Sequence, residues 1–218
     1  MISKISYPLP EKPIYIVNNP ERSFVRRLID YLFKRKRPLG FLSKKFNSSI
    51  FDEYSFIKST YGGGELQIGS ECLVFGNFVF ECPSGKIEIG KCTFIGTGTI
   101  LNSMKSISIG NNVLIAEGCT IQDHNSHSIN HLERRKDVLL ARDRYKGTPS
   151  KTKVFSEIGM GSIKIGDDCW VGKNSMILKN ATIGARSIIA AGSVVTKSFP
   201  EDVMIGGNPA KIIKHINQ

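Results

Sequence analysis

The sequence lacks any apolar stretch that could cross a membrane, and it lacks the cysteine spacing of a disulfide framework. Across 218 residues there is no run of 18 apolar side chains, and Met1 to Pro10 lack the apolar core of a signal peptide. The five cysteines form no CxxC pair and no zinc-ligand spacing. We therefore expect a cytoplasmic protein without disulfides and without a metal.

Acidic residues are scarce relative to basic ones. With 19 Asp and Glu against 30 Lys and Arg, the formal net charge is +11. Such a charge favours nucleic acid, a membrane surface or an acidic substrate as the partner. We expect no nucleic acid, because the chain has no known binding fold and no interleaving of aromatic and basic residues. An anionic glycan, a lipid headgroup and a merely solvated basic face remain open.

An aliphatic residue returns every six positions in the C-terminal third of the chain. These positions are Ile165, Val171, Ile177, Ile183, Ile189 and Val195. A small residue follows four positions after each of the first five, at Cys169, Ser175, Ala181, Ser187 and Ser193. A helix repeats at 3.6 and a strand at 2, so a period of six indicates a parallel β-helix. We expect the glycines after the aliphatic positions, such as Gly166, Gly172 and Gly184, to supply φ freedom at the bends.

The same repeat continues upstream. Its aliphatic positions are Ile68, Val74, Ile89, Ile95, Ile109, Ile115 and Ile121. The residues four positions on include Cys72, Phe78, Thr93, Thr99, Val113 and Cys119. Three hexads make one coil, so the run predicts about five coils of an all-β parallel β-helix. An antiparallel sandwich is disfavoured, because its strands would vary in spacing.

The repeat divides the chain into three parts. Residues 63–205 are expected to form the β-helix and residues 206–218 a C-terminal tail. Residues 1–62 are expected to form a small basic segment with one amphipathic helix. This helix is predicted to start at the N-cap Asn19 and the first-turn proline Pro20. The basic run from Lys34 to Arg37 follows this helix, and peripheral contact with a membrane is one interpretation of it.

One interruption of the repeat, from about residue 122 to 162, is expected to leave the β-helix as a long protruding loop. Excursions of this length are often functional. Its root contains His124, His127 and His131, three of the four histidines. Its body is basic and includes Arg134, Arg135, Arg142 and Arg144, which we expect to bind an anionic or lipid-linked carbohydrate acceptor.

Two segments carry a resemblance to a known family. IGNNVLIAEGCTIQDHNSHSINHLERR and IKIGDDCWVGKNSMILKNATIGARSIIAAGSVVTKSFPEDVMIGGNPAKIIK resemble the hexapeptide-repeat O-acetyltransferases, which include maltose, galactoside, capsule and lipopolysaccharide acetyltransferases. The resemblance covers about residues 65–214. It implies a left-handed β-helix, a homotrimer, acetyl-CoA as donor, and active sites between neighbouring subunits.

The resemblance also implies roles for individual residues. His127 matches the family's catalytic histidine, a suitable general base because its pKa lies near operating pH. His124 is the alternative base, and Asp123 either orients a histidine or caps a turn. The donor acetyl-CoA is expected to contact Trp170, Gly172, Ala191, Gly192, Thr196, Lys197, Lys211 and Lys214. Gly96 stands where sugar acetyltransferases often carry an acceptor-binding Asn, which leaves small-sugar specificity open.

The predicted reaction is direct acetyl transfer to a hydroxyl of a cell-surface polysaccharide or glycolipid sugar. A covalent acyl-enzyme is not expected, because no Ser or Cys has the setting of a nucleophile. Transfer to a nucleotide-linked amino sugar or an amino acid is the alternative. A non-catalytic β-helix scaffold and a metal-dependent carbonic anhydrase are minor alternatives, and the anhydrase is disfavoured because the three histidines share one loop root.

Overall fold

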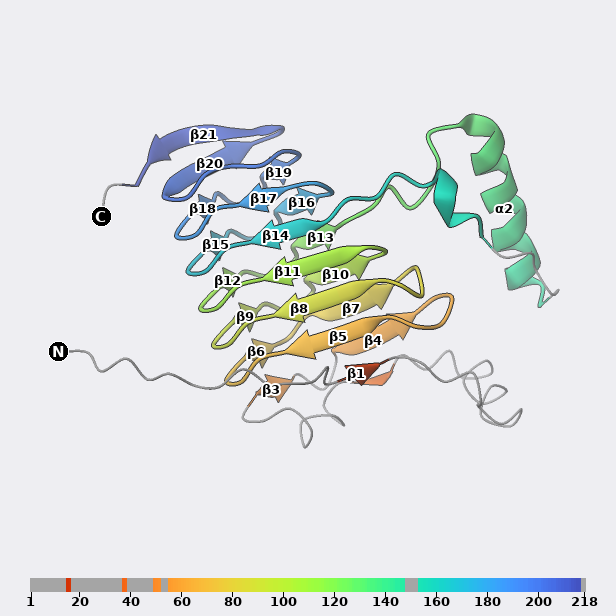
Figure 1. The fold of residues 1–218 in the computed structure, drawn as a ribbon, viewed down its shortest axis with the longest axis horizontal. Coiled ribbons are helices and arrows are strands. Elements are labelled where there is room, and N and C mark those ends of the chain that lie inside the picture. Colours follow the sequence, from red (N-terminus) through yellow and green to blue (C-terminus); the bar gives the residue numbers. More distant parts are fainter. Residues whose placement is uncertain (1–14, 17–36, 39–48, 52–54, 148–152, 217–218) are drawn as a thin grey trace.

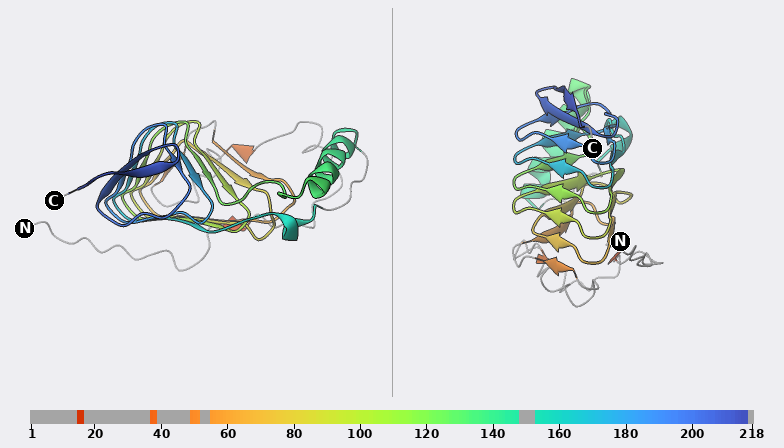
Figure 2. Two further views of the ribbon diagram at one scale, coloured as in Figure 1. Left: turned by 90° about the horizontal axis from the view of Figure 1, so that it is seen from above. Right: turned by 90° about the vertical axis from the view of Figure 1, so that its left-hand side faces the viewer.

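The computed structural model describes residues 15–16, 37–38, 49–51, 55–147 and 153–216. Successive coils stack into a triangular prism with three sheets as its faces, and one excursion projects from its side (Figures 1 and 2). The amphipathic helix predicted after Asn19 lies outside the described residues. Strands β3 (Ile50–Phe51) and β4 (Phe56–Ser59), which fall in the predicted N-terminal segment, pair in parallel with the first strands of the prism.

Each sheet forms one face of the prism, and we name the faces A, B and C. Face A contains β1 (Tyr15–Ile16), β5 (Glu65–Ile68), β8 (Lys86–Ile89), β11 (Ser106–Ile109), β14 (Ile163–Ile165) and β17 (Thr182–Ile183). Face B contains β2 (Arg37–Pro38), β4 (Phe56–Ser59), β7 (Asn77–Phe80), β10 (Ile100–Ser103), β13 (Thr120–Gln122), β16 (Met176–Leu178) and β19 (Val194–Val195). Face C contains β3 (Ile50–Phe51), β6 (Leu73–Val74), β9 (Phe94–Ile95), β12 (Leu114–Ile115), β15 (Trp170–Val171), β18 (Ile188–Ile189), β20 (Val203–Gly207) and β21 (Ala210–His215).

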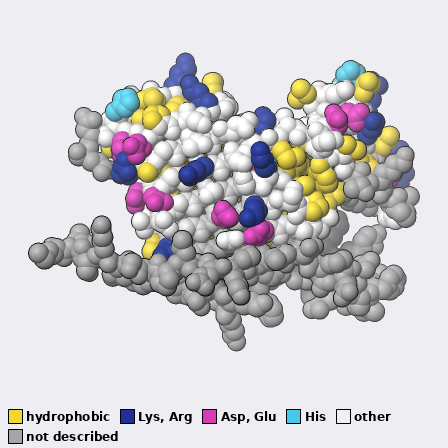
Figure 3. Space-filling view, in the orientation of Figure 1, with side chains coloured by type: hydrophobic (Ala, Val, Ile, Leu, Met, Phe, Trp, Pro, Cys, Tyr) yellow, Lys and Arg dark blue, Asp and Glu magenta, His cyan; other side chains and the backbone are white. Residues whose placement is uncertain are grey.

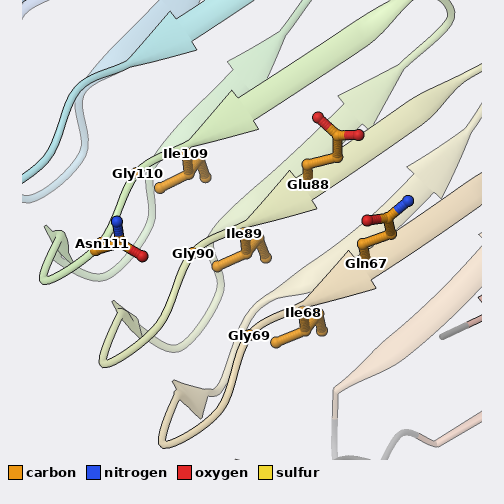
Figure 4. Close-up of a pocket in the computed structure, with 9 residues that line it drawn as sticks. All are labelled: Gln67, Ile68, Gly69, Glu88, Ile89, Gly90, Ile109, Gly110 and Asn111. Atoms are coloured by element: carbon orange, nitrogen blue, oxygen red, sulfur yellow. The ribbon is translucent and has the colours of Figure 1, made fainter. Parts of the chain in front are cut away.

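The aliphatic repeat positions form the core, as the sequence predicted. Ile68, Ile89 and Ile109 lie one above another on successive coils of face A, each followed by a glycine (Figure 4). They are buried, as are the corresponding residues of faces B and C. The five coils are confirmed, since β5, β8, β11, β14 and β17 pair in parallel, one strand per coil.

The small residues of the repeat line the inside of the corners and tie one coil to the next. Thr93 Oγ1 donates to the carbonyl of Gly110 at 3.0 Å, and Ser187 Oγ donates to the carbonyl of Pro200 at 3.1 Å. The predicted burial of the cysteines at these positions is confirmed for Cys72, Cys119 and Cys169. Larger side chains would not fit here, which explains the alternation of large and small residues in the hexad.

The expected reason for the glycines at the bends was wrong. Gly172 is not among the residues with positive φ, but a Cβ there would lie 2.6 Å from the backbone nitrogen of Ala191 on the next coil. Close packing of successive coils therefore requires the glycine. The left-handed φ occurs instead one residue before the small position, at Asp168 (57°) and Asn174 (56°).

The assignment of Phe78 to a small position was also wrong. Phe78 pairs with Leu101 and fills the large inward position of face B. It follows Val74 after only four residues, because the early coils are irregular. Their strands β7 and β8 have four residues each, whereas β17 and β18 have two.

The outward residues differ between faces. Along face A they are polar: Gln67, Glu88, Ser108, Lys164 and Thr182 occupy one register. Figure 3 shows charged side chains spread over this face and hydrophobic side chains gathered near the root of the excursion. Along face C the outward register is apolar, and we call it the face C ladder: Ile50, Leu73, Phe94, Leu114, Trp170, Ile188 and Met204.

The excursion leaves the prism between β13 and β14, where the sequence predicted a long loop. It contains a helix that the sequence analysis missed, α2 (His131–Tyr145), and a short 3₁₀ turn, η2 (Phe155–Glu157). Its two arms form an antiparallel stalk, in which Asn125 N–H donates to the Gly159 carbonyl and Gly161 N–H to the Asp123 carbonyl. No helix in the described ranges is both long and apolar enough to cross a bilayer.

Candidate active site

His127 lies just beyond the stalk, at the base of α2. Its ring Nδ1 is 2.7 Å from Oδ2 of Asp137 on the helix. The imidazole side chain is 54% exposed and the carboxylate 16% exposed. With Nδ1 held in this way, Nε2 is the ring nitrogen left to meet a substrate.

His124 has the opposite environment. It is buried in the stalk, and its Nδ1 accepts a hydrogen bond from the backbone N–H of Ser126 at 2.9 Å. Its Nε2 is buried and has no hydrogen-bond partner among the residues that the structure describes. Burial lowers the pKa of His124 below its ordinary value. These contacts favour a structural role in the stalk.

Asp123 is fully buried, and its carboxylate holds the turn between β10 and β11. Its oxygens accept hydrogen bonds from Ser103 Oγ at 2.8 Å, Met104 N–H at 2.8 Å and Lys105 N–H at 3.0 Å. Of the two roles considered for Asp123, these contacts favour the turn cap. The carboxylate beside the ring of His127 belongs instead to Asp137, which the sequence analysis did not single out.

A polar row on face B supports the stalk and was also missed. Asn102 Nδ2 donates to Glu81 Oε1 at 3.3 Å and to Gln122 Oε1 at 3.4 Å, and Gln122 Nε2 donates to the carbonyl of His124 at 2.9 Å. Asn102 and Gln122 share one register on adjacent strands. In the sequence, this row could have been predicted from the polar residues Asn102 and Gln122 at outward positions beside the loop root. The row fixes where the stalk leaves the prism.

A groove of about 490 Å³ lies beside the dyad of His127 and Asp137. It is lined by α2 and by the two arms of the excursion: Ser128, Glu133, Lys136, Asp137, Leu139, Leu140, Asp143, Val154, Glu157 and Ile158. Four of these residues are carboxylates and one is a lysine, which pairs with Glu133 at 2.7 Å. The groove is therefore acidic and partly apolar, although the excursion as a whole is basic.

The four predicted acceptor-binding arginines differ in their surroundings. Arg134 donates to the backbone carbonyls of Ser128 and Ile129, so it ties α2 to the loop before it. Arg142 pairs with Asp143 at 3.0 Å. Arg135 is exposed on α2 and is not among the groove residues. The side chain of Arg144 lies outside the described part of the structure.

The predicted donor-binding residues lie on the prism. Trp170 belongs to the face C ladder and is 51% exposed. Gly172, Ala191 and Gly192 follow strands of face C; Thr196 and Lys197 follow β19 of face B; Lys211 and Lys214 lie on β21.

One chain does not bring His127 together with the predicted donor-binding residues of face C, whereas Thr196 and Lys197 follow β19 toward the edge between faces B and A. The excursion leaves the edge between faces B and A, and in a triangular prism that edge is opposite face C. His127 and Trp170 are therefore on opposite sides of the same chain. No group of His, Cys, Asp and Glu in the described residues could hold a metal, and the expected absence of a metal stays a prediction.

Comparison with known proteins identifies the class. A family model for the bacterial transferase hexapeptide matches residues 162–197, and one for the hexapeptide repeat of succinyl-transferase matches residues 86–122. These matches, with relatives named galactoside and lipopolysaccharide O-acetyltransferases, support the hexapeptide-repeat O-acetyltransferase family. The prism is a left-handed parallel β-helix, as in the solved structures of such enzymes. The protein is an acetyltransferase.

Particular relatives differ in substrate. Galactoside O-acetyltransferase of Escherichia coli is 27% identical over 91% of this chain and 81% of its own length. A 2,3,4,5-tetrahydropyridine-2,6-dicarboxylate N-acetyltransferase of Clostridium perfringens is 41% identical, but over 32% of this chain and 26% of its own length. The hexapeptide-repeat acetyltransferase VCA0836 of Vibrio cholerae, solved with acetyl-CoA, is 25% identical over 82% of this chain and 76% of its own, with a TM-score of 0.51.

Proposed function

We propose that this protein transfers an acetyl group from acetyl-CoA to a hydroxyl of a cell-surface polysaccharide or glycolipid sugar, with His127 as the general base. The observation that carries the proposal is the environment of His127. Its Nδ1 is held by Asp137 at 2.7 Å while the ring stays half exposed beside the groove. His124, in contrast, is buried within the stalk.

The reaction follows from this geometry. Nε2 of His127 takes the proton of the acceptor hydroxyl as the oxygen attacks the thioester carbon. When the tetrahedral intermediate collapses, the carbon–sulfur bond breaks and the imidazolium returns the proton to the leaving thiolate. Direct transfer is favoured because burial raises the pKa of the thiols of Cys72, Cys119 and Cys169, which makes them poor nucleophiles.

The groove under α2 is the proposed acceptor site. The groove is lined by both apolar and polar side chains, which suits a sugar ring because a sugar also has both kinds of surface. Its four carboxylates disfavour an anionic group inside it. If the acceptor is anionic or lipid-linked, its charged part lies along Arg135 and Arg142, outside the groove.

The proposed active unit is a homotrimer with a site between neighbouring chains. The face C ladder is a continuous apolar strip with Leu114 54% and Trp170 51% exposed in the single chain. Strips of this kind are typical of protein interfaces. A head-to-tail contact between face C and the excursion edge of a neighbour would join the donor-binding residues of one chain to His127 of the next.

An acceptor panel tests the proposal. CoA release would be measured with 4-nitrophenyl galactoside, a sialic acid polymer, a lipid-linked oligosaccharide and a nucleotide-linked amino sugar. We expect a sugar hydroxyl to react and to give an ester that mild alkali cleaves. An alkali-stable amide would favour the second candidate, transfer to a small amine, which the short match to the N-acetyltransferase supports.

Substitution of the base provides the mechanistic test. His127→Ala should lower kcat by about 10²–10⁴-fold, because general base catalysis contributes that much. The affinity for acetyl-CoA should remain. His124→Asn should retain more activity than His127→Ala, and the reverse ranking would refute the assignment of the base.

A further inference from the structure

We propose that Asp137 is the positioning residue of the catalytic histidine, so that the active site is complete only when helix α2 is in place. The inference rests on the proposed role of His127 as base. Its starting observation is the 2.7 Å contact between Nδ1 of His127 and Oδ2 of Asp137. The histidine lies in the loop before the helix, and the carboxylate comes from the helix itself.

The histidine needs such a partner because its side chain is largely exposed. It is 54% exposed, and it follows Ser126, whose φ is +60° in a tight turn. A carboxylate at Nδ1 fixes the ring orientation. It also selects the tautomer with the proton on Nδ1 and the lone pair on Nε2, which is the form a general base requires.

The position of Asp137 is set by contacts at the start of α2. Asn130 caps the helix, since its Oδ1 accepts the N–H of Leu132 at 2.9 Å. Arg134 donates from the first turns of the helix to the carbonyls of Ser128 and Ile129. The residues next to His127 are therefore tied to the same helix that carries Asp137.

The carboxylate also joins the base to the acceptor groove. Asp137 lines the groove as well as contacting the ring. An ion pair with an exposed histidine contributes little to stability. A structural role would therefore leave the rate nearly unchanged when the carboxylate is removed, whereas a positioning role would not.

The first test needs no acceptor. Imidazole ¹⁵N spectra of the full chain above pH 8 should show His127 mainly as the Nδ1–H tautomer, with His127→Ala used to assign its signals. In Asp137→Asn the Nε2–H form should grow, and Asp137→Glu should restore part of the original population. An unchanged tautomer ratio in Asp137→Asn would overturn the inference.

The second test is kinetic, with acetyl-CoA and 4-nitrophenyl galactoside or the best acceptor of the panel. Asp137→Asn should lower kcat by about 10–10²-fold, the loss seen when a metal-bound histidine loses the carboxylate that orients its ring. The KM for acetyl-CoA should change less than twofold. Asp168→Asn, an exposed carboxylate on the prism, is the matched control and should keep the wild-type kcat.

The outcomes separate the two proposals. If His127→Ala is inactive and Asp137→Asn is fully active, His127 is the base and the positioning role of Asp137 is wrong. If His127→Ala keeps its activity, the proposed function of His127 itself fails. If Asp137→Asn does not fold, Asp137→Glu still decides through its tautomer ratio and kcat.

Discussion

His124 and His127 are three residues apart and have contrasting environments. The antiparallel stalk buries His124 at 2% exposure, while the tight turn after it turns His127 outward. Burial disfavours the charged form of His124 and lowers its pKa. Such different environments suit different roles. Of the two histidines only His127 is exposed, as the proposed base must be.

The buried histidine predicts how stability depends on pH. In the unfolded chain His124 binds a proton below about pH 6.5, whereas the folded chain resists protonation because the pKa is lowered. The stability that neutral His124 contributes is fully present above about pH 6.5. It is lost as the pH falls from there through the pKa of His124 in the folded chain. Denaturation at pH 7.5 and 5.0 should therefore show a smaller loss of stability in His124→Asn than in the wild type. His131→Asn, at an exposed site, should behave like the wild type.

Two glycines should respond to substitution for different reasons. A Cβ at Gly166 would lie 2.6 Å from Ala185 N, so Gly166→Ala should cost about 1–3 kcal/mol of unfolding free energy.

Gly98 has a left-handed backbone with φ +75°, but a Cβ added there would meet no atom closer than the backbone nitrogen of Gly118 at 3.9 Å. Gly98→Asn should be milder than Gly98→Ala, because Asn tolerates a left-handed φ. Urea denaturation would measure both, and equal costs at Gly98 would contradict the backbone explanation.

At the scale of elements, the strands were predictable and α2 was not. The hexad states which residues face inward, and the structure confirms the core positions from Ile68 to Val195. Helix α2 has no clear apolar stripe: Leu132, Val138 and Leu139 are all at least half exposed. A weaker signal was present, because Asn130 followed by Glu133 has the spacing of a capping box.

The predicted consequence of that cap concerns α2 alone. Asn130→Ala should destabilise the helix by about 1 kcal/mol, because Leu132 N–H loses its acceptor. Hydrogen exchange of α2 amides should become faster, while exchange in β11 and β12 stays unchanged. Because Asp137 belongs to this helix and is proposed to orient His127, kcat should fall as well. Faster exchange throughout the prism would mean that the excursion is not an independent unit.

The basic side of α2 can be tested separately from the groove. Arg135→Gln with Arg142→Gln should raise the KM of an anionic acceptor and flatten its salt dependence, because exposed charges are screened over about 8 Å at physiological salt. The KM of acetyl-CoA should stay nearly fixed. Lys164→Gln on face A together with Lys58→Gln on face B is the charge-matched control. Unchanged acceptor kinetics would mean that these arginines are only a solvated surface.

At the scale of the whole molecule, the period of the sequence predicted the prism but not its local register. Each hexad forms one side of a coil and contacts only its neighbours, so the architecture can be predicted from the repeat alone. The irregular early coils, where Phe78 fills a large position, depend on pairing with Leu101 in the next coil. The dyad of His127 and Asp137 likewise depends on where the excursion folds back, which no repeat encodes.

If the proposed homotrimer forms through the face C ladder, one substitution in the ladder should separate its subunits. Three chains of 24.1 kDa give a trimer of about 72 kDa. Leu114→Arg places a charge in the middle of the ladder, where burial without a partner is unfavourable. Light scattering should then report a monomer without activity, whereas Ser108→Arg on polar face A should remain trimeric and active. An active Leu114→Arg monomer would contradict the trimer.

Complementation decides whether each site is shared between chains. His127→Ala removes the proposed base. Ala191→Tyr, at an exposed position of the prism, should block the proposed donor groove, by which we mean the surface around Gly172, Ala191 and Gly192. Each variant alone should be inactive. If a site takes its base from one chain and its donor groove from the next, equal co-refolding should restore about a quarter of the wild-type rate, because both halves are intact in that fraction of random head-to-tail contacts. If both groups came from the same chain, no mixture would recover activity, and the shared site would have to be abandoned.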